Sequence, residues 1–255
     1  ERGQKAYEAG RRIVDMAYED LRPSMILTRE SFLNAIRLVT AIGGSTNAQP
    51  HIAAMARHAG VEVRPSDWME FGYDIPLLAN VQPAGQFLSE RFHRAGGAPA
   101  VMWELLQAGK FDGGALTVTG RTQAENLQGR EATDREVIRP FATPLKERAG
   151  FFVLHGNLFD FAILKTSVIS EEFRDRYLCP PGHEEIFEMR TIVFDGSEDY
   201  HCRINDPELG IDENCILVIR GSGRVGWPGS AEVVNMQPPD ALLQRGITSL
   251  PTLGD

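Results

Sequence analysis

Apolar residues recur at helical spacing through the first two-fifths of the chain. Between residues 5 and 20, for example, Ile13, Met16 and Ala17 follow the three-to-four-residue period of an amphipathic helix. Glycines and prolines interrupt the pattern where helices are expected to end. We expect each apolar stripe to face a core, including Met55 in the third helix. The predicted helices cover residues 5–20, 29–42, 47–59, 66–71, 85–94 and 98–108.

The pattern changes after residue 110. Residues 111–148 are polar, with few apolar runs, and contain Pro140 and Pro144, which predicts a surface excursion or a link between domains. From Gly150 onward, short apolar runs flanked by Gly, Asp or Asn are typical of β-strands, and residues 197–204 suit a short helix. The predicted strands cover residues 151–154, 161–164, 191–194 and 215–219.

These patterns divide the chain into a helical part and a β-rich part. We place the boundary near residue 146, which gives domains of residues 1–145 and 146–255. Several β runs with few helices predict a small mixed barrel or sandwich for the second part. With 255 residues, 42% of them hydrophobic, the chain suffices for one large domain or two modest ones.

The composition argues against some partners. A formal net charge of −9 disfavours nucleic acid as the main partner, because phosphate binding requires clustered Lys and Arg. No apolar run reaches the roughly 18 residues of a membrane span, and the opening residues lack the apolar segment of a signal peptide. The three cysteines are widely spaced and form neither a disulfide framework nor a zinc pattern, so we expect a cytoplasmic protein.

The first candidate site is the segment Gly43–Ala48, Gly-Gly-Ser-Thr-Asn-Ala, at the start of the third predicted helix. Two glycines make a tight turn, and Ser45, Thr46 or Asn47 can cap the helix. The unpaired N–H groups of its first turn suit a carboxylate or a phosphate. A plain glycine stop followed by a polar cap explains the same residues, and both interpretations stay open on spacing alone.

The second candidate site is a glycine-rich loop. Residues 221–229 hold four glycines and one proline, and Glu232 follows them. Glycine lets the main chain approach a ligand closely, and a carboxylate held by such a loop can bind a hard cation such as Mg²⁺. A carboxylate in a first helical turn is also an ordinary partner of the helix dipole. The glycine content exceeds what a surface loop requires and favours the cation site.

These two segments belong to a set of six that occur together in order. The set resembles the dihydroxy-acid and sugar-acid dehydratase family, and most resembles its aldonate (arabinonate- or xylonate-type) dehydratases. The resemblance runs through essentially the whole chain, and six motifs in order are far more specific than any one. The six segments are Gly43–Ala48, Pro83–Gly85, Gly96–Gly97, Gly156–Leu158, Ile211–Asn214 and Gly226–Glu232.

The resemblance implies a fold and a reaction. The fold is α/β, with a helix-rich N-terminal α/β domain and a smaller, β-barrel-like (swivelling) C-terminal domain. The reaction removes water from a sugar acid and gives a 2-keto-3-deoxy acid. An iron–sulfur cluster, 2Fe–2S in preference to 4Fe–4S, acts on the departing 3-hydroxyl as a Lewis acid, Mg²⁺ holds the carboxylate and 2-hydroxyl, and a serine removes the C2 proton. A homodimer or homotetramer is implied as well.

The resemblance also assigns roles to residues of this chain. Glu232 matches the Mg²⁺-binding glutamate, and Ser45, Thr46 and Asn47 become substrate contacts. The catalytic serine belongs to a motif that begins with an aspartate, which Asp255 matches, so the serine is expected just past it.

The chain departs from the family pattern in two ways. Cys179, Cys202 and Cys215 do not match the cluster cysteines, which belong to an N-terminal region that this chain does not contain. The loop has Gly223–Arg224 where the family usually has Gly-Pro, which bears on loop rigidity or substrate preference. We therefore expect an internal portion of a longer polypeptide that does not catalyse the reaction by itself.

Two alternatives stay open. One is a dihydroxy-acid dehydratase of branched-chain amino-acid synthesis, although Trp227–Ser230 stands where that branch usually has Gly-Pro-Gly-Met, which favours sugar acids. The other is a non-catalytic binding protein that keeps the same scaffold.

Overall fold

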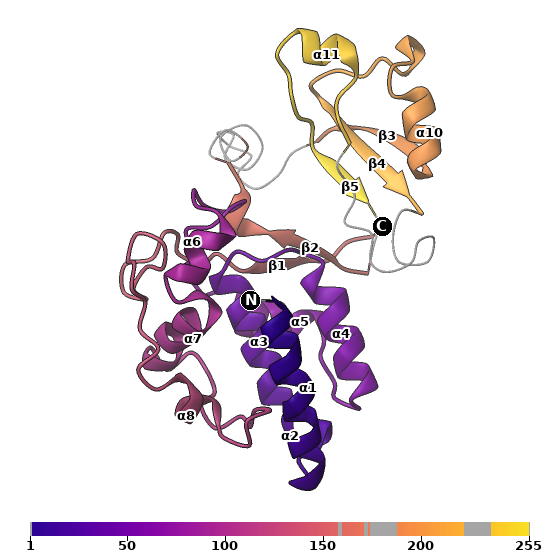
Figure 1. Ribbon diagram of the computed structural model, residues 1–255. Coiled ribbons are helices and arrows are strands. Elements are labelled where there is room, and N and C mark those ends of the chain that lie inside the picture. Colours follow the sequence, from indigo (N-terminus) through magenta and orange to yellow (C-terminus); the bar gives the residue numbers. More distant parts are fainter. Residues whose placement is uncertain (1, 158–159, 171–172, 174–187, 222–235, 255) are drawn as a thin grey trace. The chain divides into compact units, whose positions relative to one another are not determined.

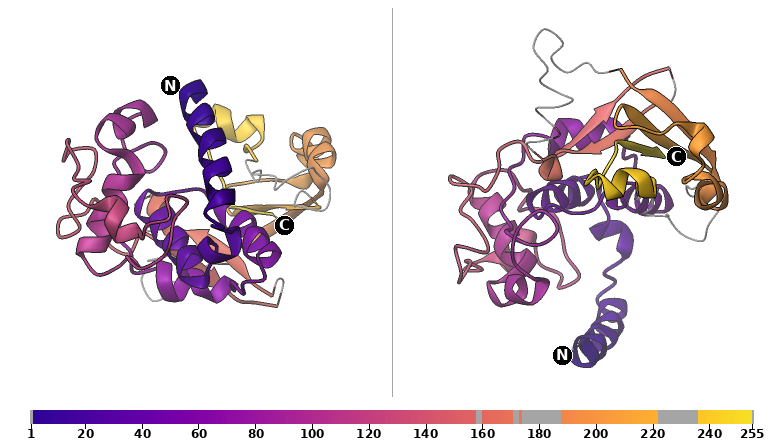
Figure 2. Two further views of the ribbon diagram at one scale, coloured as in Figure 1. Left: turned by 60° about the horizontal axis from the view of Figure 1, so that its bottom comes forward. Right: turned by 90° about the horizontal axis from the view of Figure 1, so that it is seen from above.

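The chain folds as two compact units, Glu1–Ile169 and Ser170–Asp255, each with its own core. The structure is a computed structural model that describes residues 2–157, 160–170, 173, 188–221 and 236–254 (Figure 1; Figure 2). No helix among these residues is long and apolar enough to cross a membrane. The helices of the first unit are α1 (Arg2–Tyr18), α2 (Pro23–Ile26), α3 (Arg29–Ala41), α4 (Ala48–His58), α5 (Pro65–Asp67), the π-helical turn η1 (Trp68–Gly72), α6 (Ser89–Arg94), α7 (Gly97–Gln107) and α8 (Gln123–Leu127).

Helix α3 lies at the centre of the first unit, and its ends follow from its sequence. Its N-cap is Thr28, whose hydroxyl accepts the N–H of Ser31 while the Ser31 hydroxyl accepts the N–H of Thr28, a reciprocal capping box. It ends before Gly43, which has a positive φ of 66° that glycine adopts without strain. The helices over 29–42 and 47–59 are thus confirmed.

A β-hairpin covers one side of α3 and α4 (Figure 1). Its strands β1 (Phe151–Leu154) and β2 (Ala162–Lys165) pair antiparallel, as the apolar runs predicted. Phe151 packs edge-on against Trp68, with ring centroids 5.0 Å apart. The short 3₁₀ helix η2 (Thr166–Val168) follows β2 directly.

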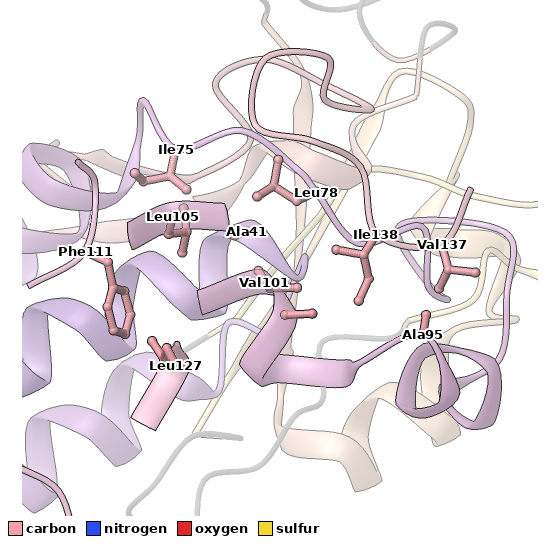
Figure 3. Close-up of a cluster of buried hydrophobic side chains, with 11 residues drawn as sticks. Ala41, Ile75, Leu78, Ala95, Val101, Leu105, Phe111, Leu127, Val137 and Ile138 are labelled. Carbon is pink, nitrogen blue, oxygen red and sulfur yellow. The ribbon is translucent and has the colours of Figure 1, made fainter. Parts of the chain in front are cut away.

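The segment 111–148 corrects the prediction of a surface excursion or domain link. Its sparse apolar residues enter the main core of the first unit, where Leu127, Val137 and Ile138 pack with α7 (Figure 3). Backbone hydrogen bonds tie it in: Arg139 N–H donates to Leu78 O at 2.9 Å. The prediction from hydrophobic periodicity was wrong because a few separate buried side chains, and not a regular apolar stripe, hold this segment in place.

Two of the predicted apolar stripes are only partly buried. In α1, Met16 is buried, but Ile13 and Ala17 are exposed. On α4, Met55 is 52% exposed, against the prediction that it faces the core. The amphipathic period identified both helices correctly, but it could not say which apolar residues have a neighbour to pack against.

The second unit contains a parallel three-stranded sheet in the order β3-β4-β5. Parallel strands need crossover connections and are buried on both faces, and β4, the central strand, is almost entirely buried. Helix α10 follows β3 and packs Tyr200 against Phe194, with ring centroids 5.4 Å apart. The elements are β3 (Arg190–Asp195), α10 (Gly196–Arg203), the 3₁₀ helix η4 (Pro207–Leu209), β4 (Cys215–Arg220), α11 (Asp240–Gln244) and β5 (Thr252–Gly254).

The α/β character of the chain is therefore confirmed. The described strands form an open parallel sheet and a hairpin, and they do not close into a barrel. Along the sequence, the boundary between the two compact units falls between residues 169 and 170. The domain assignment of 1–145 and 146–255 stays a prediction, and residue 146 lies shortly before β1.

Candidate functional site

The turn between α3 and α4 is built so that only glycine fits at its first position. A Cβ on Gly43 would lie 2.7 Å from the Cβ of Ala84 and 3.0 Å from Cδ1 of Leu77. A Cβ on Gly44 would lie 2.8 Å from Cγ1 of Val39. The turn thus packs directly on Ala84, so the structure brings together two of the six motif segments, Gly43–Ala48 and Pro83–Gly85.

The segment that carries Ala84 is itself held tightly. The Gln82–Pro83 peptide bond is cis, and a Cβ on Gly85 would lie 2.5 Å from Asn80 main-chain and side-chain atoms. The Asn80 side chain accepts the N–H of Gln86 at 2.8 Å. Ala84 is therefore a fixed wall beside the Gly43 turn.

Ser45, Thr46 and Asn47 lie together at the start of α4, with Ser45 and Thr46 exposed and Asn47 half-buried. Asn47 occupies the N-cap position, but its side chain makes no capping hydrogen bond. Instead, Ser45 Oγ accepts the N–H of Asn47 at 3.2 Å. The main-chain N–H groups of Ser45 and Thr46 have no acceptor among the described residues. The predicted substrate-binding role of these three residues stays a prediction.

Lys165 reaches the same turn from β2. In the hairpin register it stands opposite Phe151, and residues opposite each other in an antiparallel pair project on the same face. Phe151 faces the core, so Lys165 is directed inward and is half-buried. Its Nζ donates to the carbonyl of Gly43 at 2.7 Å. Burial lowers the pKa of the Lys165 ammonium from its ordinary value.

Ser167 adds a buried hydroxyl beside the turn. The Thr166 hydroxyl fixes this segment by donating to the carbonyl of Gly150 at 2.6 Å. Ser167 is only 7% exposed, and its Oγ has no hydrogen-bond partner within the described structure. That oxygen lies 4.0 Å from the point where a Cβ on Gly43 would stand. A buried hydroxyl without a partner is uncommon and requires an explanation.

The resulting site is rich in hydrogen-bond donors. An ammonium group, two main-chain N–H groups and a buried hydroxyl lie at or next to the turn, and no acidic side chain among the described residues pairs with Lys165. Sequence reasoning found the turn but not Lys165 or Ser167. The available signal was the period of two in the strand, which places Lys165 on the same face as the inward Ile163.

The remaining motif segments have structural roles where they are described. Gly96–Gly97 forms the start of α7 with φ of 117° and 59°. In the second unit, Asp212 accepts the N–H of Asn214 at 2.9 Å in the turn before β4. That hydrogen bond holds the pKa of the Asp212 carboxyl below its ordinary value.

The possible metal ligands among the described residues do not gather in one place. Within them, no group of three His, Cys, Asp or Glu side chains is placed to hold a metal. Cys202 is exposed, whereas Cys215 is buried and its Sγ lies 3.3 Å from Asp212 Oδ1. The predicted metal ligand Glu232 lies outside the described residues, as do Cys179 and Asp255.

Comparisons with known proteins agree with these motifs. Residues 1–126 match the family model for the dihydroxy-acid/6-phosphogluconate dehydratase N-terminal domain, and residues 136–255 match the C-terminal domain. A D-xylonate dehydratase of Caulobacter vibrioides is 71% identical over 255 residues, which cover 100% of this chain and 43% of that protein. An L-arabinonate dehydratase of Rhizobium leguminosarum is 40% identical over 247 residues, 96% of this chain and 41% of that protein.

A dihydroxy-acid dehydratase of Lactococcus lactis is 36% identical over 251 residues, 97% of this chain and 41% of that protein. The chain thus spans about two-fifths of the length of the curated relatives it matches. The two family models leave only the residues between 126 and 136 of the chain unmatched. The chain belongs to the dihydroxy-acid/6-phosphogluconate dehydratase family.

Proposed function

We propose that the protein containing this chain dehydrates a sugar acid of the aldonate class to a 2-keto-3-deoxy acid. The observation that carries the proposal is the gradient of identity among relatives. The D-xylonate dehydratase is 71% identical and the dihydroxy-acid dehydratase 36% identical over almost the same residues. A pocket that accepts a polyhydroxylated chain needs polar contacts that a branched aliphatic substrate does not, and the donor-rich Gly43 turn agrees with this requirement.

In this proposal the described residues bind and orient the substrate. Ser45 and Thr46 offer exposed hydroxyls and main-chain N–H groups, and Asn47 offers a carboxamide at the helix start. Such groups suit the oxygen atoms of a hydroxy acid. Gly43 packs so closely on Ala84 that an added Cβ would clash, and this close packing helps to hold the turn in place.

A substrate panel tests the proposal. The full-length protein is assayed with D-xylonate, L-arabinonate and 2,3-dihydroxy-3-methylbutanoate, and formation of the 2-keto acid is measured. We expect turnover of at least one aldonate to exceed turnover of the branched acid. Preference for the branched acid would support the dihydroxy-acid dehydratase alternative, and no turnover of any acid by cofactor-loaded protein would support a non-catalytic binding protein.

The cofactors are part of the same proposal. An iron–sulfur cluster, 2Fe–2S rather than 4Fe–4S, would supply Lewis-acid chemistry at the 3-hydroxyl, and Glu232 would bind Mg²⁺. An iron–sulfur cluster predicts visible absorbance of the full-length protein. A Mg²⁺ ligand at Glu232 predicts that Glu232→Gln weakens Mg²⁺ binding, measured by equilibrium titration, without loss of the folded state. Unchanged Mg²⁺ affinity would remove this role from Glu232.

The proposal also covers the partners, the oligomeric state and the location of the whole protein. We expect a sugar acid as the small-molecule partner, no nucleic-acid or membrane partner, a homodimer or homotetramer, and a cytoplasmic location. We also propose that the parallel sheet of the second unit belongs to a smaller, barrel-like domain of the whole protein. Light scattering of the full-length protein measures the oligomer directly.

A further inference from the structure

We propose that Lys165, Ser167 and the Ser45–Thr46 main chain form a binding subsite for the carboxylate of a hydroxy acid. The inference rests on the proposed function for the kind of acid, but the subsite itself follows from the geometry of the first unit. It deepens the predicted role of the Gly43 turn, because it names the charged group that the turn binds and the residue that supplies the positive charge.

First, Lys165 is placed so that its ammonium group can bind an anion at the Gly43 turn. Its ammonium group is half-buried because the hairpin register directs it inward, opposite Phe151. The one hydrogen bond it makes within the described structure is to a neutral acceptor, the carbonyl of Gly43 at 2.7 Å. An ammonium group has three N–H donors, so donors remain for a ligand. A partly buried cation without an anionic partner is unfavourable, and a bound anion removes that cost.

The second step is the pair of main-chain N–H groups. Ser45 and Thr46 immediately precede α4, an 11-residue helix whose N-terminus carries partial positive charge. Neither N–H has an acceptor among the described residues. Consecutive free N–H groups beside a helix start are a recurrent anion-binding arrangement, and Lys165 bonds to Gly43 only two residues before Ser45.

The third step is Ser167, which is independent of the helix. Its hydroxyl oxygen is buried, has no hydrogen-bond partner among the described residues and lies 4.0 Å from the point where a Cβ on Gly43 would stand. Such a group is expected to be satisfied by a ligand or a water. A carboxylate has two oxygens that each accept more than one hydrogen bond. It can therefore satisfy these donors and still present an oxygen to a cation.

The test is direct binding without turnover. The full-length protein is titrated calorimetrically with D-xylonate and with xylitol, which has the same hydroxyl chain without a carboxylate. In Lys165→Gln the donor to Gly43 is kept and the charge is removed. We expect D-xylonate affinity to fall at least about tenfold, the effect of losing one charge-assisted hydrogen bond, while xylitol binding is unchanged.

Lys146→Gln is the matched control. Lys146 is also a half-buried lysine, and its Nζ donates to the main-chain carbonyls of Thr166 at 2.8 Å and Ser167 at 3.5 Å. We expect this variant to keep D-xylonate affinity within about twofold. An equal loss in both variants would show a general charge effect and overturn the proposal, as would unchanged affinity in Lys165→Gln.

A second variant keeps the proposal testable if Lys165→Gln does not fold. Ser167→Ala removes only the unpartnered hydroxyl, and we expect a smaller, severalfold loss of D-xylonate affinity. Equal losses for D-xylonate and xylitol would overturn the assignment to the carboxylate. Finally, 2,3-dihydroxy-3-methylbutanoate distinguishes this inference from the proposed function: if the branched acid alone binds and its affinity depends on Lys165, the aldonate proposal fails and the carboxylate subsite stands.

Discussion

In helix α1 and in the segment 111–148, the burial of apolar side chains is the opposite of what their sequences predict. The helix has a regular apolar stripe, yet Tyr7, Ile13, Val14 and Tyr18 are 68%, 59%, 53% and 89% exposed. The segment has no regular apolar period, yet it sends fully buried side chains into the core of the first unit (Figure 3). Periodicity therefore reports the kind of element, whereas burial depends on which neighbours the fold supplies.

The two regions also differ in how their polar groups are satisfied. Segment 111–148 is held by hydrogen bonds to α3 and to residues 77–80, for example Asn80 N–H to Val137 O at 2.8 Å. Helix α1 satisfies its own backbone, and its Arg12 side chain donates to Val118 O at 2.6 Å. A long irregular segment becomes ordered only when its main-chain groups find such partners. The ordered structure of residues 111–148 therefore depends on individual hydrogen bonds and buried side chains, and a single substitution can remove each of them.

The largest expected effect comes from Ile138, which is fully buried in the segment. Ile138→Ala should lower the free energy of unfolding by about 2–5 kcal/mol, because it removes buried methyl groups and leaves a cavity. Denaturant unfolding of the chain measures the change. Val118→Ala is the control on the same segment, since Val118 is 52% exposed and should change stability by less than about 0.5 kcal/mol. Equal costs would contradict the anchored character of residues 111–148.

The next effect concerns Asn34, a buried side chain of α3. Its Nδ2 donates to Asp112 O at 2.9 Å and its Oδ1 accepts Asp112 N–H at 2.8 Å, so it fixes the start of the segment. Asn34→Ala should cost about 2 kcal/mol, because two partly buried main-chain groups of Asp112 lose their partners. Hydrogen exchange of the Asp112 amide should accelerate strongly.

An exposed asparagine that also makes two hydrogen bonds to one aspartate controls for the number of hydrogen bonds. Asn205 is exposed, and it both donates to Asp240 Oδ2 at 3.2 Å and accepts Asp240 N–H at 2.8 Å. Asn205→Ala should cost about 1 kcal/mol or less, because water replaces the lost partner. If Asn34→Ala and Asn205→Ala lower the free energy of unfolding equally, burial does not explain how strongly Asn34 stabilises the segment.

This pair of asparagines shows where sequence reasoning stops. The helices over 29–42 and 47–59 and all four apolar strand runs could be predicted, because each depends on residues close in sequence. The link between Asn34 and Asp112 spans 78 residues, and that between Lys165 and Gly43 spans 122. No local period encodes such pairs. The turn was therefore predictable as a candidate site, whereas the lysine and the buried hydroxyl beside it were not.

A smaller effect is expected at α8, the single short helix of the segment. Thr122 Oγ1 accepts the N–H of Glu125, and the Glu125 carboxylate accepts the N–H of Thr122 at 2.7 Å. Thr122→Ala should cost about 1 kcal/mol, as for other N-caps. The main-chain hydrogen bond also holds the pKa of the Glu125 carboxyl below its ordinary value.

The pH dependence of this cap has a definite sign. Because the folded-state pKa of Glu125 is lowered, the cap contributes stability above the ordinary carboxyl pKa and loses it as pH falls through the lowered one. In Thr122→Ala the pKa should move up toward the ordinary value, since the hydroxyl that also donates to Glu125 at 2.8 Å is gone. NMR titration of the Glu125 carboxyl measures it; an unchanged pKa would show that the main-chain bond alone sets the shift.

The smallest effect is expected on the exposed face of α1. Val14→Gln should change the free energy of unfolding of this chain by less than about 0.5 kcal/mol, because the side chain is 53% exposed and glutamine suits a helix at least as well as valine. Met16, two residues further on, is 6% exposed, so Met16→Gln should cost well over 1 kcal/mol by burying an amide. A large loss of stability in Val14→Gln would mean that the apolar stripe of α1 is buried. Helix α1 and residues 111–148 would then differ only in how regularly their apolar residues are spaced, and not in burial.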